Sequence, residues 1–330
     1  MARVLRDHPT ETRLALVLLA ICIGLSLASD SFLTLVNFTS LLNNNAVNVI
    51  WAVGLLVVLI AGGIDISFAV AASVVQYVAT YVLLGVGGGN WAIGFLLAAS
   101  LGMALGFVNA ALIHYFRIIS IVVTIATFNA FFGLLMFFSS GRYLYDLPGW
   151  WTGRIIIWER QSANGTWAEL TLPVAVMVGC MLATWVLIRH TTTGRQLYAF
   201  GDNPEGARRL GVNIGLMQFT AFGWMGAMAG IAGLMQVNIA REVVPNALIG
   251  RELDVLAAVV LGGARLGGGR GSVLGCVLGV MLVAVTQNGL NLLGVSPYAF
   301  KMVVGAIILI AISTSGIGLV SRRAERDAAP

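Results

Sequence analysis

Charge is scarce in this sequence. Only 10% of its 330 residues are Asp, Glu, Lys or Arg, whereas soluble domains average about 25%. Hydrophobic residues make up 58% of the chain, and its mean hydropathy is +0.91. A soluble chain of this length could not bury so many apolar side chains in one core, because surface still grows with size. The composition therefore excludes a soluble globular protein and predicts one that lies in a lipid bilayer.

Cysteine and histidine are also rare, with three of each. The cysteines stand singly inside apolar runs, so we expect no disulfide framework and no metal site. No HExxH motif occurs, and no Ser–His, Cys–His or His–Glu arrangement lies within the apolar runs. The net charge of +5 comes mostly from arginines in short loops, without the basic stripe of a nucleic-acid-binding surface. We therefore expect no catalytic centre, no metal, no cofactor and no nucleic-acid partner.

The chain has a single lysine, Lys301. A phosphate-binding loop needs the pattern GxxxxGK[ST], and the glycine-rich stretch Gly262–Ser272 lacks that lysine, so we interpret it as a tight turn. The chain therefore does not hydrolyse ATP by itself. No paired carboxylates lie inside the apolar runs. Such pairs relay ions in transporters, so a proton- or sodium-coupled carrier is the less favoured alternative.

The apolar runs predict an all-α polytopic bundle of about ten transmembrane helices, forming one membrane domain over residues 1–330. The first run is short and follows three arginines, as in a cleavable signal peptide. We prefer a retained helix, because ten spans place both termini on one side. The predicted spans are Leu14–Ala28, Ala46–Ala61, Phe68–Gly85, Trp91–His114, Ile118–Ser140, Thr171–Arg189, Gly215–Val237, Glu252–Gly262, Ser272–Leu293 and Ala299–Gly316.

The basic residues predict the orientation of these spans. Thirteen of them fall at the two termini and in the loops on the same side, and six fall on the opposite side. Positively charged loops stay in the cytoplasm. Both termini are therefore expected to be cytoplasmic.

Two segments between spans are long. Residues 141–170 should be external and are rich in tryptophan and tyrosine. Two interpretations stay open for them: an aromatic belt at the level of the lipid headgroups, or a surface that receives a binding protein. Residues 190–214 should be cytoplasmic, with a loop opening at Thr191–Gly194. Asn203 and Pro204 mark the start of a short helix, Glu205 suits its first turn, and Gly211 should end it.

Five motifs in order resemble the permeases of the ribose, arabinose and xylose class of ABC importers, over almost the whole chain. They are Gly62–Ser67 (GGIDIS), Ile121–Thr127 (IVVTIAT), Gly194–Val212, Glu252–Ser272 and Asn288–Val295. The chain departs from the family pattern at Phe68–Val70, Ala110, Ala126 and Arg251, which bears on the solute more than on the class.

The resemblance implies the type II ABC importer permease fold in a bacterial inner membrane. It also implies a separate ATP-binding subunit, a periplasmic solute-binding protein and a second permease copy, identical or closely related, within membrane lipid. The solute would be a pentose or hexose; a furanose quorum signal or a deoxysugar is the alternative. The segment that couples transport to the ATPase would contain Gly194, Arg195, Gly201, Asn203, Glu205, Ala207, Arg208 and Gly211.

Uncharged polar residues inside the apolar runs are the candidates for the solute pathway. Buried polar groups are costly unless they are paired or hydrated, so each either bonds a neighbouring helix or faces the pathway. Gly62 and Gly63 can break a helix, and Asp65 and Ser67 would cap the helix that follows. The candidate pathway residues are Asp65, Ser67, Asn109, Thr124, Thr127, Asn288 and Asn291.

Overall fold

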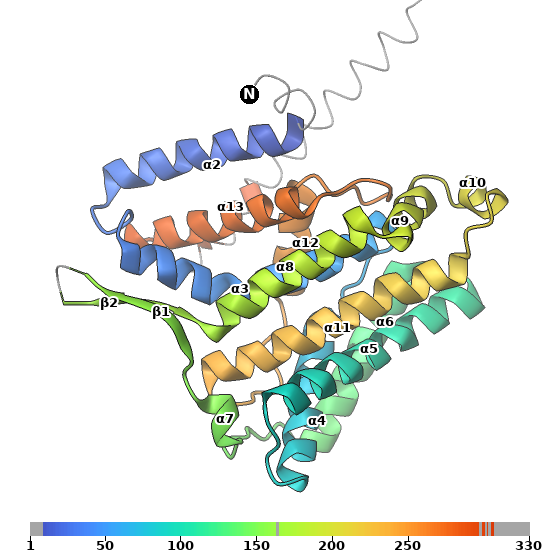
Figure 1. The fold of residues 1–330 in the computed structure, drawn as a ribbon, viewed down its shortest axis with the longest axis horizontal. Helices are drawn as coiled ribbons and strands as arrows, with labels where there is room; N and C mark the ends of the chain where they lie inside the picture. Colours follow the sequence, from blue (N-terminus) through green and yellow to red (C-terminus); the bar gives the residue numbers. More distant parts are fainter. Residues whose placement is uncertain (1–8, 163–164, 297–298, 301, 303–304, 307–330) are drawn as a thin grey trace, which may run out of the picture.

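The computed structural model describes residues 9–162, 165–296, 299–300, 302 and 305–306. Within these residues the chain forms twelve helices and one β-hairpin (Figure 1). The helices are α2 (Pro9–Ala28), α3 (Leu35–Ile60), α4 (Phe68–Gly85), α5 (Trp91–Phe116), α6 (Ser120–Ser139), α7 (Gly149–Thr152), α8 (Leu172–His190), α9 (Thr192–Asp202), α10 (Pro204–Arg209), α11 (Ile214–Ala240), α12 (Glu252–Leu261) and α13 (Val273–Leu292). The hairpin pairs β1 (Ile156–Gln161) with β2 (Trp167–Thr171) in antiparallel register.

Eight of these helices are long and apolar enough to cross a membrane: α2, α3, α4, α5, α6, α8, α11 and α13. This confirms a polytopic helical membrane bundle. The predicted eighth span is the ten-residue helix α12, which is about 15 Å long at 1.5 Å per residue and is half the length needed to cross the ~30 Å hydrocarbon core. The predicted tenth span, Ala299–Gly316, lies mostly outside the described residues. The number of spans and the sidedness of the termini stay predictions.

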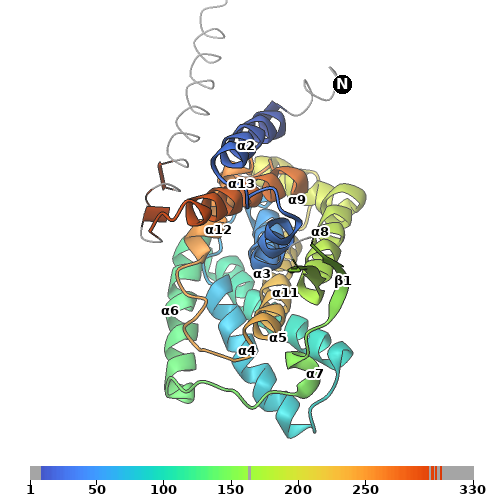
Figure 2. The same cartoon turned by 90° about the vertical axis from the view of Figure 1, so that its left-hand side faces the viewer.

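Helix α3 is the central element of the bundle. It packs against α8, α11, α12 and α13, and all of residues 49–60 are buried. Figure 2 shows it between α6 on one side and α8 on the other. By contrast, α2 lies along α13 at the edge of the bundle, and only 6% of its residues Glu11–Ala28 are buried. A helix that stays apolar while exposed on this scale is expected to face lipid.

Helix α3 begins eleven residues before the predicted start at Ala46, because Thr34 caps it by accepting a hydrogen bond from the Asn37 N–H. Its first turns contain polar residues, so a search for apolar runs did not include them in the predicted helix. Some of them have partners across the bundle. Asn43 binds the Glu169 carbonyl at 2.7 Å and the Thr171 hydroxyl at 2.6 Å, both in β2.

The two ends of the bundle carry different structures. The β-hairpin and α7 lie at one end, called here the hairpin end, and α9 and α10 lie at the other, the α9–α10 end (Figure 1). The segment 141–170 at the hairpin end is folded rather than irregular. The Trp151 indole is fully buried and donates to the Leu234 carbonyl, and Asn238 donates to the Trp151 carbonyl. Trp158 and Trp167 of the hairpin are exposed, as are Tyr143 and Tyr145, and the two interpretations of this segment stay open.

Candidate functional site

The α9–α10 end contains the segment that the sequence marks as a coupling element. Asn203 caps α10 by accepting from the Gly206 N–H at 2.9 Å, and Pro204 holds the first position of the helix. Gly211 ends it in the left-handed conformation, with the Val212 N–H bonded to the Ala207 carbonyl, the arrangement that closes many helix C-termini. The short helix is therefore placed as predicted.

Helix α9 replaces the predicted loop. Thr191 caps it by accepting from the Gly194 N–H at 3.0 Å, so Gly194 lies in the first turn of a helix instead of opening a loop. Leu197 and Phe200 are buried on one face of α9, at helical spacing from Gly194 and Gly201. The signal in the sequence was this four-residue apolar face, which is shorter than the runs that identify spans.

The end of α9 meets the core through backbone contacts. A Cβ on Gly201 would overlap the Ile60 carbonyl at the end of α3, and the Gly269 N–H donates to the same carbonyl at 2.9 Å. Three segments therefore meet at one point: α3, α9 and the glycine-rich loop at 262–272. We call Ile60, Gly201 and Gly269 the glycine junction.

Tyr198 adds a side-chain hydrogen bond between α9 and the glycine-rich loop, next to the glycine junction. Its hydroxyl donates to the Gly271 carbonyl at 2.7 Å. Burial raises the pKa of this hydroxyl, while the positive charge of Arg189 opposes the shift. The tyrosine therefore keeps its proton at neutral pH and remains a donor. A movement of α9 would be transmitted to α3 and the glycine-rich loop together.

Most of α10 faces away from the bundle. Within it only Ala207 is buried, and Leu210, which follows its last turn, is 83% exposed. Arg208 is exposed beside it, and Glu205 pairs with Arg209 at 2.7 Å. Arginines are enriched among the residues that dominate protein interfaces, so this exposed face is suited to contact another protein. Arg195, on α9, is also exposed.

Four of the pathway candidates meet at the break between α3 and α4. Asp65 accepts hydrogen bonds from the N–H and the hydroxyl of Ser67, at 2.8 and 2.7 Å. The amide of Asn109, in α5, donates to the Ser67 hydroxyl at 2.8 Å. Thr124, in α6, contacts the Ile64 carbonyl at 3.3 Å. The four side chains join the broken backbone to two neighbouring helices.

The predicted cap of α4 is partly wrong. Ser67 holds the N-cap position but its side chain makes no cap hydrogen bond, because it is bonded to Asp65 and Asn109. Asp65 instead accepts from the backbone two residues ahead. Non-helical backbone at membrane depth needs such partners.

The other three candidates lie elsewhere. Thr127 bonds the Val123 carbonyl of its own helix. Asn288 exchanges two amide hydrogen bonds with Asn37, at 2.9 and 3.1 Å, which join α13 to α3. Asn291 is exposed. The structure therefore groups four of the seven candidates, and a role in solute passage stays a prediction for all seven.

Asp65→Ala should destabilise the protein, because the Ser67 N–H and hydroxyl would lose their acceptor inside the bundle. Leaving buried donors unpaired costs about 1–3 kcal/mol. Asp65→Asn keeps an oxygen in the same place and should retain most of the stability. Thermal melting of the detergent-solubilised chain measures both. Equal melting temperatures for the two variants would contradict a structural role for this carboxylate.

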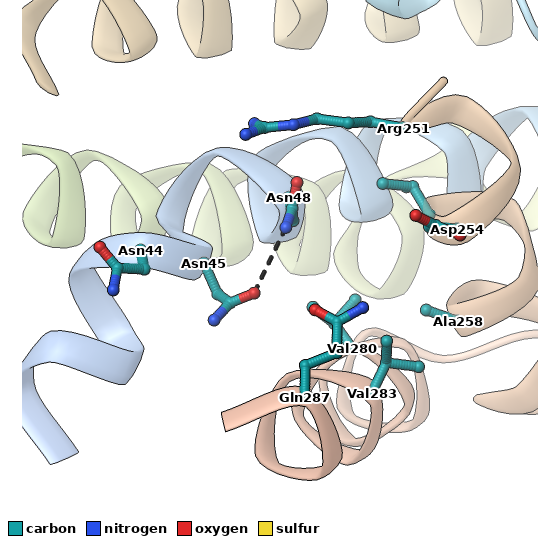
Figure 3. Close-up of a pocket in the computed structure, with 10 residues that line it drawn as sticks. Asn44, Asn45, Asn48, Arg251, Asp254, Ala258, Val280, Val283 and Gln287 are labelled. Carbon is teal, nitrogen blue, oxygen red and sulfur yellow. Dashed lines mark hydrogen bonds between the residues drawn. The ribbon is translucent and has the colours of Figure 1, made fainter. Parts of the chain in front are cut away.

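A polar, partly open cavity of about 260 Å³ lies between α3, α12 and α13 (Figure 3). Ligand pockets typically measure about 300–1,000 Å³, so its size suits a small solute. Aliphatic side chains of α12 and α13 form the apolar part of its lining. The polar residues that line it are Asn44, Asn45, Asn48, Arg251, Asp254 and Gln287.

Sequence reasoning missed this cavity. Gln287 is an uncharged polar residue inside an apolar run, and Arg251 stood out only as a departure from a family pattern. Asn44 and Asn45 precede the predicted span Ala46–Ala61, and Asn48 lies within it but was not singled out. Because the lining comes from segments some 200 positions apart in the chain, no local pattern could place these residues together.

A model of the family described as "branched-chain amino acid transport system / permease component" matches residues 37–312. The ribose import permease protein RbsC of Escherichia coli K12 is 31% identical over 315 residues, which cover 91% of each chain. The chain belongs to this permease family. It is thus an inner-membrane, non-catalytic component of a transport system.

Two further relatives of the permease have other names. The autoinducer 2 import system permease protein LsrC of Photorhabdus luminescens is 30% identical over 297 residues, 88% of the permease and 85% of the relative. The galactose/methyl galactoside import permease protein MglC of Escherichia coli K12 is 27% identical over 312 residues, 92% of each chain. No solved structure matches the permease.

Proposed function

We propose that the permease carries a sugar or sugar-like solute into the cytoplasm, driven by a separate ATP-binding subunit and supplied by a periplasmic solute-binding protein. The names of its relatives support this class, since they import ribose, galactose and autoinducer 2. The observation that best supports the proposal is the glycine junction. There α9, which leads into the exposed helix α10, is in backbone contact with the central helix α3.

In this proposal the α9–α10 end is cytoplasmic, and α10 docks on the ATP-binding subunit. ATP binding and hydrolysis move α10, and α9 carries the movement to α3 through Ile60. Two permease copies, identical or closely related, switch between access from outside and from inside. The solute passes from the outside into the cytoplasm during this switch.

Uptake into vesicles tests the function. The permease would be co-reconstituted with candidate ATP-binding and solute-binding proteins, with ATP on the ATPase side. We expect D-ribose or D-galactose to accumulate only when ATP and both partners are present. Accumulation without ATP would identify an ion-coupled carrier and overturn the proposal. Preferential uptake of autoinducer 2 would favour the second candidate, for which the LsrC relative is the specific observation.

Leu210→Asp and Arg208→Glu test the docking of α10. Both side chains are exposed, so the variants should reach the membrane in normal amounts. Loss of an interface anchor costs at least about 2 kcal/mol at a hot spot, and ATP-driven uptake should fall by more than tenfold. Arg117→Glu is the matched control, because Arg117 is an exposed arginine at the end of α5, outside α10. Uptake unaffected by either α10 variant would exclude α10 as the docking element.

A further inference from the structure

The cavity between α3, α12 and α13 has a lining that suits a neutral, hydroxyl-rich molecule. Four amides line it, and each amide offers both donors and an acceptor. Arg251 and Asp254 add one positive and one negative group. Their formal charges cancel, so the lining carries no net charge.

One atom in the lining lacks a partner. The Asn48 carbonyl oxygen is buried and has no hydrogen-bond partner among the residues that the structure describes. The amide nitrogen of the same side chain donates to Asn45 at 3.3 Å (Figure 3). Buried acceptors are rarely left unpaired in native proteins, and an unpaired one costs about 1–3 kcal/mol. A hydroxyl group entering the cavity would supply the missing donor.

We propose that this cavity is the station at which the permease holds its solute during passage, and that it selects a neutral molecule with several hydroxyl groups. Asp254 accepts from solute hydroxyls, Arg251 donates to them, and Asn48 accepts one more. The aliphatic part of the lining, which includes Val255 and Val280, packs against the C–H groups of the solute. This inference rests on the proposed function and names the residues that would hold its solute.

The position of the cavity fits a station along a path. Asn45 stands ten residues after the start of α3, about 15 Å along the helix at 1.5 Å per residue. Ile60 of the glycine junction follows fifteen residues later, about 22 Å further along the same helix. One buried helix therefore lines the cavity and also contacts the coupling segment. A displacement of α3 by α9 would change the shape of the cavity.

A zwitterionic amino acid is the competing occupant, since its carboxylate and ammonium groups could pair with Arg251 and Asp254. The four amides argue against it. An amino acid with a branched apolar side chain would leave most of them unpaired, and burying unpaired polar groups is costly. Comparing D-ribose with L-leucine decides between the two occupants.

Thiol protection tests the station without the ATPase or the binding protein. Asn44 is exposed within the cavity lining, so Asn44→Cys in a Cys22→Ser background should react with a small polar maleimide. The other two cysteines are buried. Thr166→Cys, in the hairpin turn, is the control. We expect millimolar D-ribose to slow labelling at position 44 severalfold and to leave position 166 unchanged. Protection by L-leucine alone, or by neither compound, would overturn the inference.

Asp254→Ala tests the same inference in transport. Losing a charge-assisted hydrogen bond costs about 1.5–3 kcal/mol, or roughly 10–150-fold, so D-ribose uptake should fall by at least tenfold. The control is Asp146→Ala, at an exposed aspartate outside the cavity.

The two failures are distinguishable. If the wild-type permease imports no sugar with ATP and partners, the proposed function fails, whatever the cavity binds. If the wild type imports D-ribose and Asp254→Ala imports it equally well, the importer function stands and the station is overturned.

Discussion

A leucine in place of Gly226 should prevent α5 and α11 from packing, and the chain should not reach its folded state. The backbones of the two helices touch at this point: a Cβ on Gly226 would overlap the Gly102 carbonyl, and a Cβ on Gly102 would overlap the Gly226 carbonyl. Small residues permit such close approach between membrane helices. Overpacking costs about 1–3 kcal/mol even where side chains can adjust. Here the obstacle is backbone, and we expect a loss of at least ~3 kcal/mol.

Gly133→Leu is the matched control. Gly133 is exposed on α6, and a Cβ there would meet no atom of the described residues within 4 Å. Exposed substitutions usually change stability by less than about 0.5 kcal/mol, and leucine forms helices better than glycine. Size-exclusion profiles and thermal melting in detergent measure both variants. If Gly226→Leu eluted and melted like the control, the close contact of α5 with α11 would be wrong.

Gly201→Ala should abolish ATP-driven uptake while leaving the bundle folded. The added methyl group would overlap the Ile60 carbonyl and lie 2.6 Å from the Gly269 nitrogen, so it would force α9 away from α3. The hydrogen bond between Gly269 and Ile60 would break. A distortion of about 1–3 kcal/mol confined to the junction is small against the packing of the spans. We expect uptake to fall by at least about tenfold, since 1.4 kcal/mol corresponds to a factor of ten.

The control for Gly201→Ala is Gly179→Ala, on α8, where a Cβ would have no neighbour within 4 Å in the part of the chain that the structure describes. Uptake and binding-protein-stimulated ATPase activity would be measured on both variants at equal amounts in the membrane. Normal coupling in Gly201→Ala would mean that α9 acts on the core by another route. Loss of the folded protein would mean that the junction serves stability before it serves transport.

The long apolar helices were accessible from the sequence. Helix α4 spans Phe68–Gly85, as predicted, and α5, α6, α8, α11 and α13 begin and end within three residues of their predicted bounds. Lipid accounts for this success, because a span needs about 20 consecutive apolar residues and few other structures do. The cap at Asn203 and Pro204 was equally readable, since capping is a local hydrogen bond between residues three apart.

The sequence did not predict the elements that are held by partners elsewhere in the chain. The first turns of α3 carry asparagines that an apolar pattern rejects, yet they are stable because Asn43 binds the hairpin and Asn37 binds Asn288. Helix α9 is too short for a span and is held by the glycine junction. The hairpin depends on the same remote contacts. In each case the partner is distant in the chain, so the local sequence carries no signal.

The sequence by itself determined that this protein lies in a membrane, which segments form its long helices, and where the short helix α10 begins and ends. These properties follow from local hydropathy and local capping. Only the tertiary structure decided which polar side chains meet: Asp65 with Ser67 and Asn109 at a helix break, and Asn48 with Asp254 and Gln287 around a cavity. The physical reason is that lipid and the protein interior are both apolar, so a span has no polar face to indicate which side is buried. The directions of its few polar residues are fixed only when the helices pack.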